Sequence, residues 1–166
     1  MKLILIAAVS ENNVIGKDNK LIWRLPADMK FFKEKTLDHC IITGRKNYES
    51  IPEKFRPLPG RINIIVTRNK NFSDFPAVVV TSIEAAIEAA KALKETECFI
   101  IGGGEIYKQT ISIADEMWIT KVHAEFEGDT VFPDIDLNVW NVEERLKFTK
   151  DDKHNYNFTM FKYTRK

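Results

Sequence analysis

The chain has 166 residues, of which 44% are hydrophobic, so it is long enough for one domain with a sizeable core and too short to divide comfortably into two. Lys and Arg together number 25 and Asp and Glu 24, and these charges are spread along the chain, which argues against an extended basic face for nucleic acid or an acidic membrane. We therefore expect a single domain, residues 1–166, with neither of those partners.

The first segment, MKLILIAAVSENN, has the outline of a signal peptide, with Lys2 before an apolar run from Leu3 to Val9. A run of this length is at the minimum for a signal core, whereas it fits a fully buried strand. No later segment approaches the ~18 apolar residues of a membrane span. We expect a strand here, without export or membrane insertion.

The second element is a helix from about Pro26 to Leu37, because RLPADMKFF (24–32) places a proline in a first helical turn. Helical spacing puts Asp28 on the same side as Phe31 and Phe32. Two interpretations of this acid are open. It can complement the helix dipole from solvent, which is the commoner role, or it can be a functional carboxylate beside the aromatic rings.

Strands and helices then alternate. The apolar segments that favour strands are CIITG (40–44), INIIVT (62–67), AVVVT (77–81) and CFIIGGG (98–104). The segments that favour helices are RKNYESI (45–51), IEAAIEAAKALKE (83–95, with Ser82 as its N-cap) and EIYKQTISIA (105–114). This alternation is typical of a parallel sheet.

The pattern changes after EMWITKVHAEF (116–126), which favours another strand. NVEERLKFT (141–149) and YNFTMFKYT (156–164) indicate long strands around the polar turn KDDKHN (150–155), with no helix between them. We therefore expect an antiparallel hairpin that closes one edge of the sheet. The Pro-rich loop IPEKFRPLPGR (51–61) is stiff rather than disordered, and such loops often line a site.

Cysteine and histidine give little chemistry of their own. Cys40 and Cys98 each begin an apolar run, which suits buried free thiols in a reducing compartment. His39, His123 and His154 are far apart and lack metal-ligand spacing, so no metal site is expected. Serine-hydrolase and P-loop motifs are also missing. Catalysis would have to use a cofactor.

Glycine and basic residues follow three of the predicted strands, in TGRK (43–46), VTR (66–68) and IGGGE (101–105). Ligands gather at the carboxyl ends of parallel strands, where helix N-termini present free N–H groups to phosphates. Glycines let the backbone approach a pyrophosphate, and Arg45, Lys46 and Arg68 suit an additional phosphate, as in NADP. Taken singly, the glycines fit a tight strand-to-helix connection and the basic residues fit chance; their joint appearance favours the cofactor.

Seven ordered segments between residues 5 and 133 resemble the dihydrofolate reductase family of the bacterial type: LIAAVSENNVIG, LIWRLPADMKFF, ITGRKNYESI, RPLPGRINIIVTR, IIGGGEIY, WITKV and EGDTVFP. The resemblance implies a three-layer α/β fold, in which four helices flank a mixed, mostly parallel eight-stranded sheet that ends in a C-terminal antiparallel hairpin. It also implies a monomer that reduces 7,8-dihydrofolate to tetrahydrofolate with NADPH, supplies one-carbon metabolism and binds antifolate inhibitors. Together with the free thiols, we expect this enzyme in the cytoplasm.

By resemblance, Asp28 is the only ionisable side chain of the pteridine pocket, and its carboxylate accepts hydrogen bonds from the pterin 2-amino group and N3. Burial would raise its pKa, whereas the pterin donors favour the ionised form. Thr120 would bond this carboxylate. The segment Gly16–Trp23, with Leu21 and Trp23, matches a mobile loop that closes over the nicotinamide and meets Asp129; a water admitted near Leu21 would protonate pterin N5.

The other implied substrate contacts are apolar walls and one cation. The walls match Ile6, Ala8, Met29, Phe32, Ile51, Leu58 and Ile101, for which plain core packing is the alternative. Arg61 matches the arginine that pairs with the glutamate α-carboxylate, a contact for which a planar guanidinium is suited.

The implied cofactor contacts surround the strand ends. Ala8, Ile15 and Gly16 match nicotinamide contacts, and Arg45, Thr67 and Arg68 match the 2′-phosphate pocket. Gly102, Gly103 and Gly104 match a turn whose first Gly–Gly bond is cis in the family. The other expected contacts are Gly44, Lys46, Asn47, Glu105, Ile106 and Tyr107.

Three residues depart from the family pattern: Ile22 stands where many relatives have Pro, Asn47 where Thr or Ser is frequent, and Glu105 where the bacterial prototype has Arg. Two other functions stay open on the sequence. One is a related NADPH-dependent reductase of riboflavin synthesis, although no deaminase zinc motif precedes the domain. The other is a noncatalytic NADPH- or folate-binding module.

Overall fold

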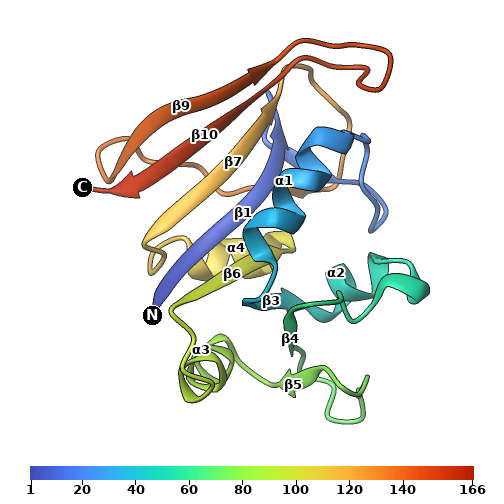
Figure 1. Ribbon diagram of the computed structural model, residues 1–166, viewed down its shortest axis with the longest axis vertical. Coiled ribbons are helices and arrows are strands. Elements are labelled where there is room, and N and C mark those ends of the chain that lie inside the picture. Colours follow the sequence, from blue (N-terminus) through green and yellow to red (C-terminus); the bar gives the residue numbers. More distant parts are fainter.

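The computed structural model describes all 166 residues and is built on one central sheet (Figure 1). Its strand order is β5-β4-β3-β6-β1-β7-β10-β9. The strands are β1 (Lys2–Ser10), β3 (Cys40–Gly44), β4 (Ile62–Val66), β5 (Val78–Val80), β6 (Glu97–Gly102), β7 (Glu116–Val122), β9 (Trp140–Phe148) and β10 (Phe158–Arg165). All pairs are parallel except those of β10, which is antiparallel to both β7 and β9. The predicted mixed eight-stranded sheet with a closing hairpin is confirmed.

Four helices cover the two faces of this sheet, as expected (Figure 1). They are α1 (Pro26–Thr36), α2 (Arg45–Ser50), α3 (Ile83–Ala92) and α4 (Gly104–Thr110), and a 3-10 turn, η1, spans Glu53–Phe55. Alternate residues of β1 point to opposite faces: Leu3 and Leu5 join the core beneath α3 and α4, whereas Ile4 and Ile6 join the core beneath α1. The first segment is therefore a buried central strand.

Helix ends differ from the sequence prediction. Ser82 caps α3 as expected, accepting a hydrogen bond from the Ala85 amide at 3.0 Å, but the helix ends at Ala92 instead of residue 95. Lys94 takes a left-handed conformation (φ 60°), which terminates the helix. The α4 helix begins at Gly104 and ends at Thr110, because the next residues fold into a turn in which the Ala114 amide donates to the Thr110 carbonyl.

A second, two-stranded antiparallel sheet of β2 (Val14–Gly16) and β8 (Thr130–Val131) was not predicted. Strands this short give no alternation that a sequence pattern can reveal. Cys40 and Cys98 are buried free thiols, as expected. None of the helices is both long and apolar enough to span a membrane.

Candidate active site

A small apolar pocket of about 290 Å³ lies at the start of α1. Its lining is Ala8, Leu21, Trp23, Arg24, Leu25, Asp28 and Met29. Asp28 is the only carboxylate among them. The exposed Arg24 also contributes to the lining. The pocket therefore holds one half-buried carboxyl group among mostly apolar groups.

Asp28 points into the protein. Its Oδ1 accepts a hydrogen bond from the Thr120 hydroxyl at 2.5 Å, and Thr120 lies on β7 directly opposite Ala8 of β1. Burial raises the pKa of the Asp28 carboxyl, and the hydrogen bond from Thr120 acts in the opposite direction without cancelling the shift. An acid that served only the helix dipole would remain in solvent. The structure thus favours the second of the two interpretations of RLPADMKFF.

Large apolar side chains are exposed at this pocket. Leu21 is 72% exposed and Met29 is 52% exposed. Four of the expected wall residues lie together beneath α1: Ile6 is buried in the core cluster there, and Phe32, Leu58 and Ile101 are partly buried and pack against it. Ile51 is half-buried and belongs to neither the pocket nor this cluster. Exposed apolar side chains beside a charged group indicate a ligand surface.

Arg61 has a half-buried guanidinium that is oriented by hydrogen bonds to neighbouring residues. Its Nε donates to the Pro59 carbonyl at 2.9 Å and its Nη1 to the Thr36 hydroxyl at 3.2 Å, which fixes the guanidinium at the end of α1. Asn63 braces this loop through hydrogen bonds with the Leu58 backbone. No carboxylate pairs with Arg61, and burial lowers its pKa. The unused N–H donors of this half-buried cation can receive a carboxylate.

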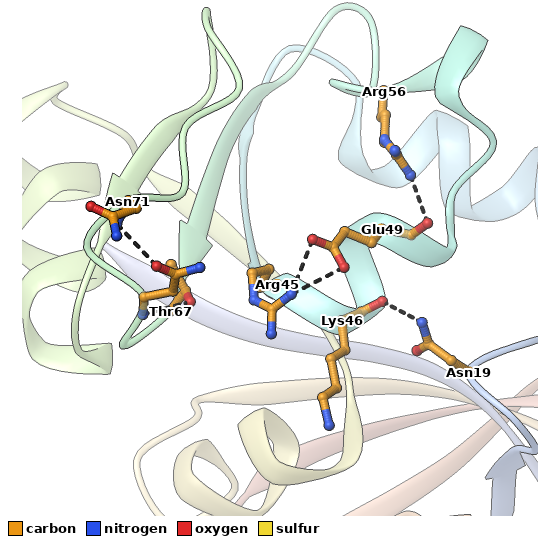
Figure 2. Close-up of polar contacts among 8 residues, drawn as sticks. Asn19, Arg45, Lys46, Glu49, Arg56, Thr67 and Asn71 are labelled. Carbon is orange, nitrogen blue, oxygen red and sulfur yellow. Dashed lines mark hydrogen bonds and ion pairs between the residues drawn. The ribbon is translucent and has the colours of Figure 1, made fainter.

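A larger cleft of about 810 Å³ lies at the carboxyl ends of the parallel strands, where α2, α3 and α4 begin. Most of the expected cofactor residues line it: Ile15, Gly16, Gly44, Arg45, Lys46, Asn47, Thr67, Arg68, Gly103, Gly104, Glu105 and Ile106. Figure 2 shows Arg45 and Lys46 at the start of α2 and Thr67 at the end of β4. The volume falls within the range of known cofactor sites, and the three helix starts suit an anion.

The cleft has an excess of positive charge. Four cations line it, namely Lys20, Arg45, Lys46 and Arg68, against the two carboxylates Glu84 and Glu105. Arg45 is partly engaged, because its Nη1 lies 3.1 Å from Glu49 Oε1 (Figure 2). Arg68 is exposed and makes no ion pair within the chain. Like the exposed Lys20 and Lys46, which also form no ion pair, it is available to a phosphate.

The glycine turn after β6 is packed tightly. The Gly102–Gly103 bond is cis, as the resemblance implied, and Gly102 has a φ of 112°. A Cβ on Gly104 would lie 2.8 Å from the Thr130 side chain. Asn47 braces the turn through its side-chain amide, which donates to the Thr43 hydroxyl at 2.9 Å and the Ile101 carbonyl at 3.2 Å. Asn47, which stands where Thr or Ser is frequent in the family, thus supports the turn from within the cleft.

Three expected cofactor residues lie outside the cleft lining. Ala8 lines the small pocket instead. Gly102 is buried, and Tyr107 lies behind it, with its hydroxyl donating to the Ile6 carbonyl at 2.6 Å. Burial raises the pKa of Tyr107 well above its ordinary range. Glu105, by contrast, does line the cleft; it is exposed and accepts a hydrogen bond from Gln109.

The loop between Gly16 and Trp23 connects the two cavities, because Leu21 lines both of them. The expected bond to Asp129 is present: its carboxylate accepts from the Asp18 amide at 2.9 Å, and its own amide donates to the Gly16 carbonyl. This amide bond is the main reason that the pKa of Asp129 is lowered. The loop is thus held at its N-terminal end while Leu21 stays exposed.

Sequence reasoning missed part of the cleft lining: Asn19, Lys20, Ser50, Val66, Asn69, Thr81, Ser82, Ile83, Glu84, Gln109 and Thr130. Thr81 and Ser82 directly follow β5, so the strand-end rule that found the other residues also applies to them. Thr130 enters through the unpredicted β8. Asn19 reaches the cleft because its side chain donates to the Lys46 carbonyl at 2.9 Å (Figure 2).

Comparisons with known proteins agree with this geometry. The family model described as dihydrofolate reductase matches residues 2–165. The chain is 42% identical to dihydrofolate reductase of Staphylococcus haemolyticus over 165 residues, covering 99% of this chain and 96% of that protein. It is 40% identical to dihydrofolate reductase of Bacillus subtilis over 161 residues, covering 97% and 93%. A solved structure of dihydrofolate reductase from Enterococcus faecalis, complexed with NADP(H) and RAB-propyl, matches with a TM-score of 0.89 and 38% identity, covering 99% of this chain and 96% of that one.

Proposed function

The chain belongs to the dihydrofolate reductase family, and from that premise we propose how its two cavities divide the work of the reaction. The protein is an NADPH-dependent oxidoreductase that reduces 7,8-dihydrofolate to 5,6,7,8-tetrahydrofolate. The observation that carries the division is the half-buried carboxylate of Asp28 in an apolar pocket, next to a larger cationic cleft that shares Leu21 with it.

The cleft residues fit NADPH, which supplies the hydride when it is bound. We assign Arg45, Thr67 and Arg68 to the 2′-phosphate, since two cations and a hydroxyl converge at the ends of β3 and β4. Gly103 leaves room for a backbone approach to the pyrophosphate, because a Cβ there would meet only Asn47 Cβ at 3.8 Å. The excess positive charge of the lining favours a multiply charged anion.

The small pocket holds the pterin. Asp28 accepts from the 2-amino group and N3, and Thr120 keeps its Oδ1 oriented while the second oxygen stays available. The negative charge favours the protonated form of pterin N5. No other acid lines the pocket, so a water delivers the proton to N5 when the loop around Leu21 moves. Arg61 binds the α-carboxylate of the glutamate tail.

The broader setting follows from composition and burial. We propose that residues 1–166 act as a single domain, as a monomer, in the cytoplasm, where the buried free thiols Cys40 and Cys98 remain reduced. Binding of antifolate inhibitors to the Asp28 pocket belongs to the same proposal.

A direct assay tests the activity. The near-ultraviolet absorbance of NADPH should decrease when the purified protein and dihydrofolate are both present, and should stay constant when either is omitted. Constant absorbance together with measurable binding of both ligands would instead identify a noncatalytic binding module.

A further inference from the structure

The N-terminus of α1 lacks a capping side chain of its own. Leu25 occupies the N-cap position and makes no side-chain cap bond, and Pro26 has no N–H to satisfy. The first free amide is that of Ala27, which donates to Nε2 of His154 at 3.0 Å. His154 lies 127 residues downstream, in the turn between β9 and β10. A distant side chain thus supplies the cap.

The contacts of His154 determine its protonation state. A backbone N–H can only donate, so Nε2 must carry a lone pair and Nδ1 must carry the hydrogen. Nδ1 then donates to Asp151 Oδ1 at 2.8 Å, and this oxygen also accepts from the amides of Lys153 and His154. These bonds lower the pKa of Asp151 and keep it ionised. His154 is therefore a neutral imidazole whose tautomer is fixed by Asp151.

The capped amide directly precedes Asp28. A carboxylate at the third helical position is well placed to bond the free amides of its own first turn. Here the imidazole accepts the hydrogen bond of the Ala27 amide, and Asp28 Oδ1 accepts one from the Thr120 hydroxyl instead. The side chain of His154 is only 9% exposed and packs beside Phe158, which shares a core cluster with Leu25. The cap is therefore buried and packed against the core.

We propose that His154 is a positioning residue for Asp28: by satisfying the Ala27 amide, it keeps the Asp28 carboxylate turned toward Thr120 and the substrate pocket. Asp151 supports it by holding the required tautomer. This inference rests on the role proposed above for Asp28, and it adds a residue from the hairpin turn that touches neither substrate nor cofactor.

Two nearly isosteric variants separate the cap from general packing. His154→Asn keeps a donor near the position of Nδ1 for Asp151 and loses the acceptor for Ala27, whereas His154→Gln can place its amide oxygen near the position of Nε2. We expect His154→Asn to lower kcat/KM for dihydrofolate about fivefold to tenfold, the fold-change that corresponds to about one hydrogen bond, and to leave the KM for NADPH within about twofold. His154→Gln should restore most of the loss.

A double-mutant cycle gives the deciding measurement. If His154 acts through Asp28, His154→Asn should cause little further loss of kcat/KM in an Asp28→Asn background, because the group that it positions has gone. His39→Asn serves as the matched control, since His39 is also partly buried and lies against Glu95 at the start of β3. It should not change either constant. Binding of folate, followed by protein fluorescence, should weaken in parallel with kcat/KM.

An equal loss from His154→Asn in both backgrounds, or a Gln variant as impaired as the Asn variant, would overturn the proposal. If His154→Asn fails to fold, Asp151→Ala takes its place in the test. Asp151 is exposed, and without it the His154 ring is free to turn an N–H toward the Ala27 amide, which removes the acceptor. A normal kcat/KM for Asp151→Ala would also contradict the proposed role of His154. If Asp28→Asn itself matches the wild type, the proposed role of Asp28 has failed, and the His154 proposal falls with it.

Discussion

The two cavities handle charge in opposite ways. The small pocket holds a single carboxylate, Asp28, which is half-buried and bonded to a buried threonine. The large cleft holds four cations, of which Arg45 is half-buried and the other three are exposed. A charge among apolar groups acts at a low effective dielectric, whereas exposed charges are screened by water and salt. Control of the reaction should therefore depend on one residue, while cofactor selection is shared among several.

The largest expected effect belongs to Asp28→Asn. The amide keeps the shape but removes the charge that favours protonated N5, so hydride transfer should decrease by the ~10² to 10⁴-fold typical of lost acid–base assistance. Solvent must then supply the protonated substrate, so the residual activity of the variant should climb as pH falls. The wild type should lose activity only as pH rises past the apparent pKa of the enzyme–substrate complex. Values of kcat for both proteins across roughly pH 5 to 9 would check this. A near wild-type rate of Asp28→Asn at neutral pH would show that the reaction does not depend on this single carboxylate of the small pocket.

The same substitution should not weaken the fold. Because burial raises the pKa of Asp28 in the folded state, the folded protein binds this proton more tightly than the unfolded chain does. Stability from this group is therefore lost as pH rises from its ordinary pKa through the raised one, and the ionised carboxylate is a cost at neutral pH. We expect the Tm of Asp28→Asn at neutral pH to equal or exceed that of the wild type. A clear decrease would mean that Asp28 is structural.

On the cleft side, Arg68→Ala should reduce the preference for NADPH over NADH by about tenfold, since NADH lacks the phosphate that a charge-assisted bond would contact. Activity with NADH should stay nearly unchanged. Lys70→Ala is the control, because Lys70 is an exposed neighbouring cation outside the lining. Added salt should lower the wild-type preference as well, since Arg68 is screened. Equal kcat/KM for both cofactors in the wild type would refute this assignment.

Arg61 combines features of the two cavities: it is half-buried like Asp28, and it is a cation without a carboxylate partner like Arg68. Arg61→Ala should raise the KM for dihydrofolate by about tenfold and leave a pterin without the glutamate tail almost unaffected. Steady-state kinetics with the two substrates provides the comparison. Matched losses on both would show that its bonds to Pro59 and Thr36 serve only the loop.

The smallest effect should come from Thr120→Val, which removes one neutral donor from Asp28. The hydrogen bond lowers the pKa of this carboxyl, so its loss should move the pKa further upward and decrease kcat/KM for dihydrofolate about fivefold. Thr159→Val is the matched control, since Thr159 is equally buried on β10 and bonds His123 instead. If both variants behave alike, the effect belongs to the sheet rather than to Asp28.

Local sequence determined much of this molecule. The apolar runs fixed the strands of the sheet, Ser82 fixed the start of α3, and glycine and basic residues at strand ends marked the cleft. These features depend on neighbours in the chain: capping, side-chain alternation and backbone freedom act within a few residues. Thr81 and Ser82 were missed, but they also follow the end of a parallel strand, β5, where ligands gather.

Only the tertiary structure decided where the Asp28 carboxylate lies. Its partner Thr120 is 92 residues away, and the side chain that caps its helix is farther still. Local propensity at RLPADMKFF is satisfied equally by an acid in solvent and by one in a pocket, because both lie in the first turn. The choice follows from packing β7 and the β9–β10 hairpin against α1, which brings a hydroxyl and an imidazole to one helix end. Such contacts depend on strand order and burial, which no single segment encodes.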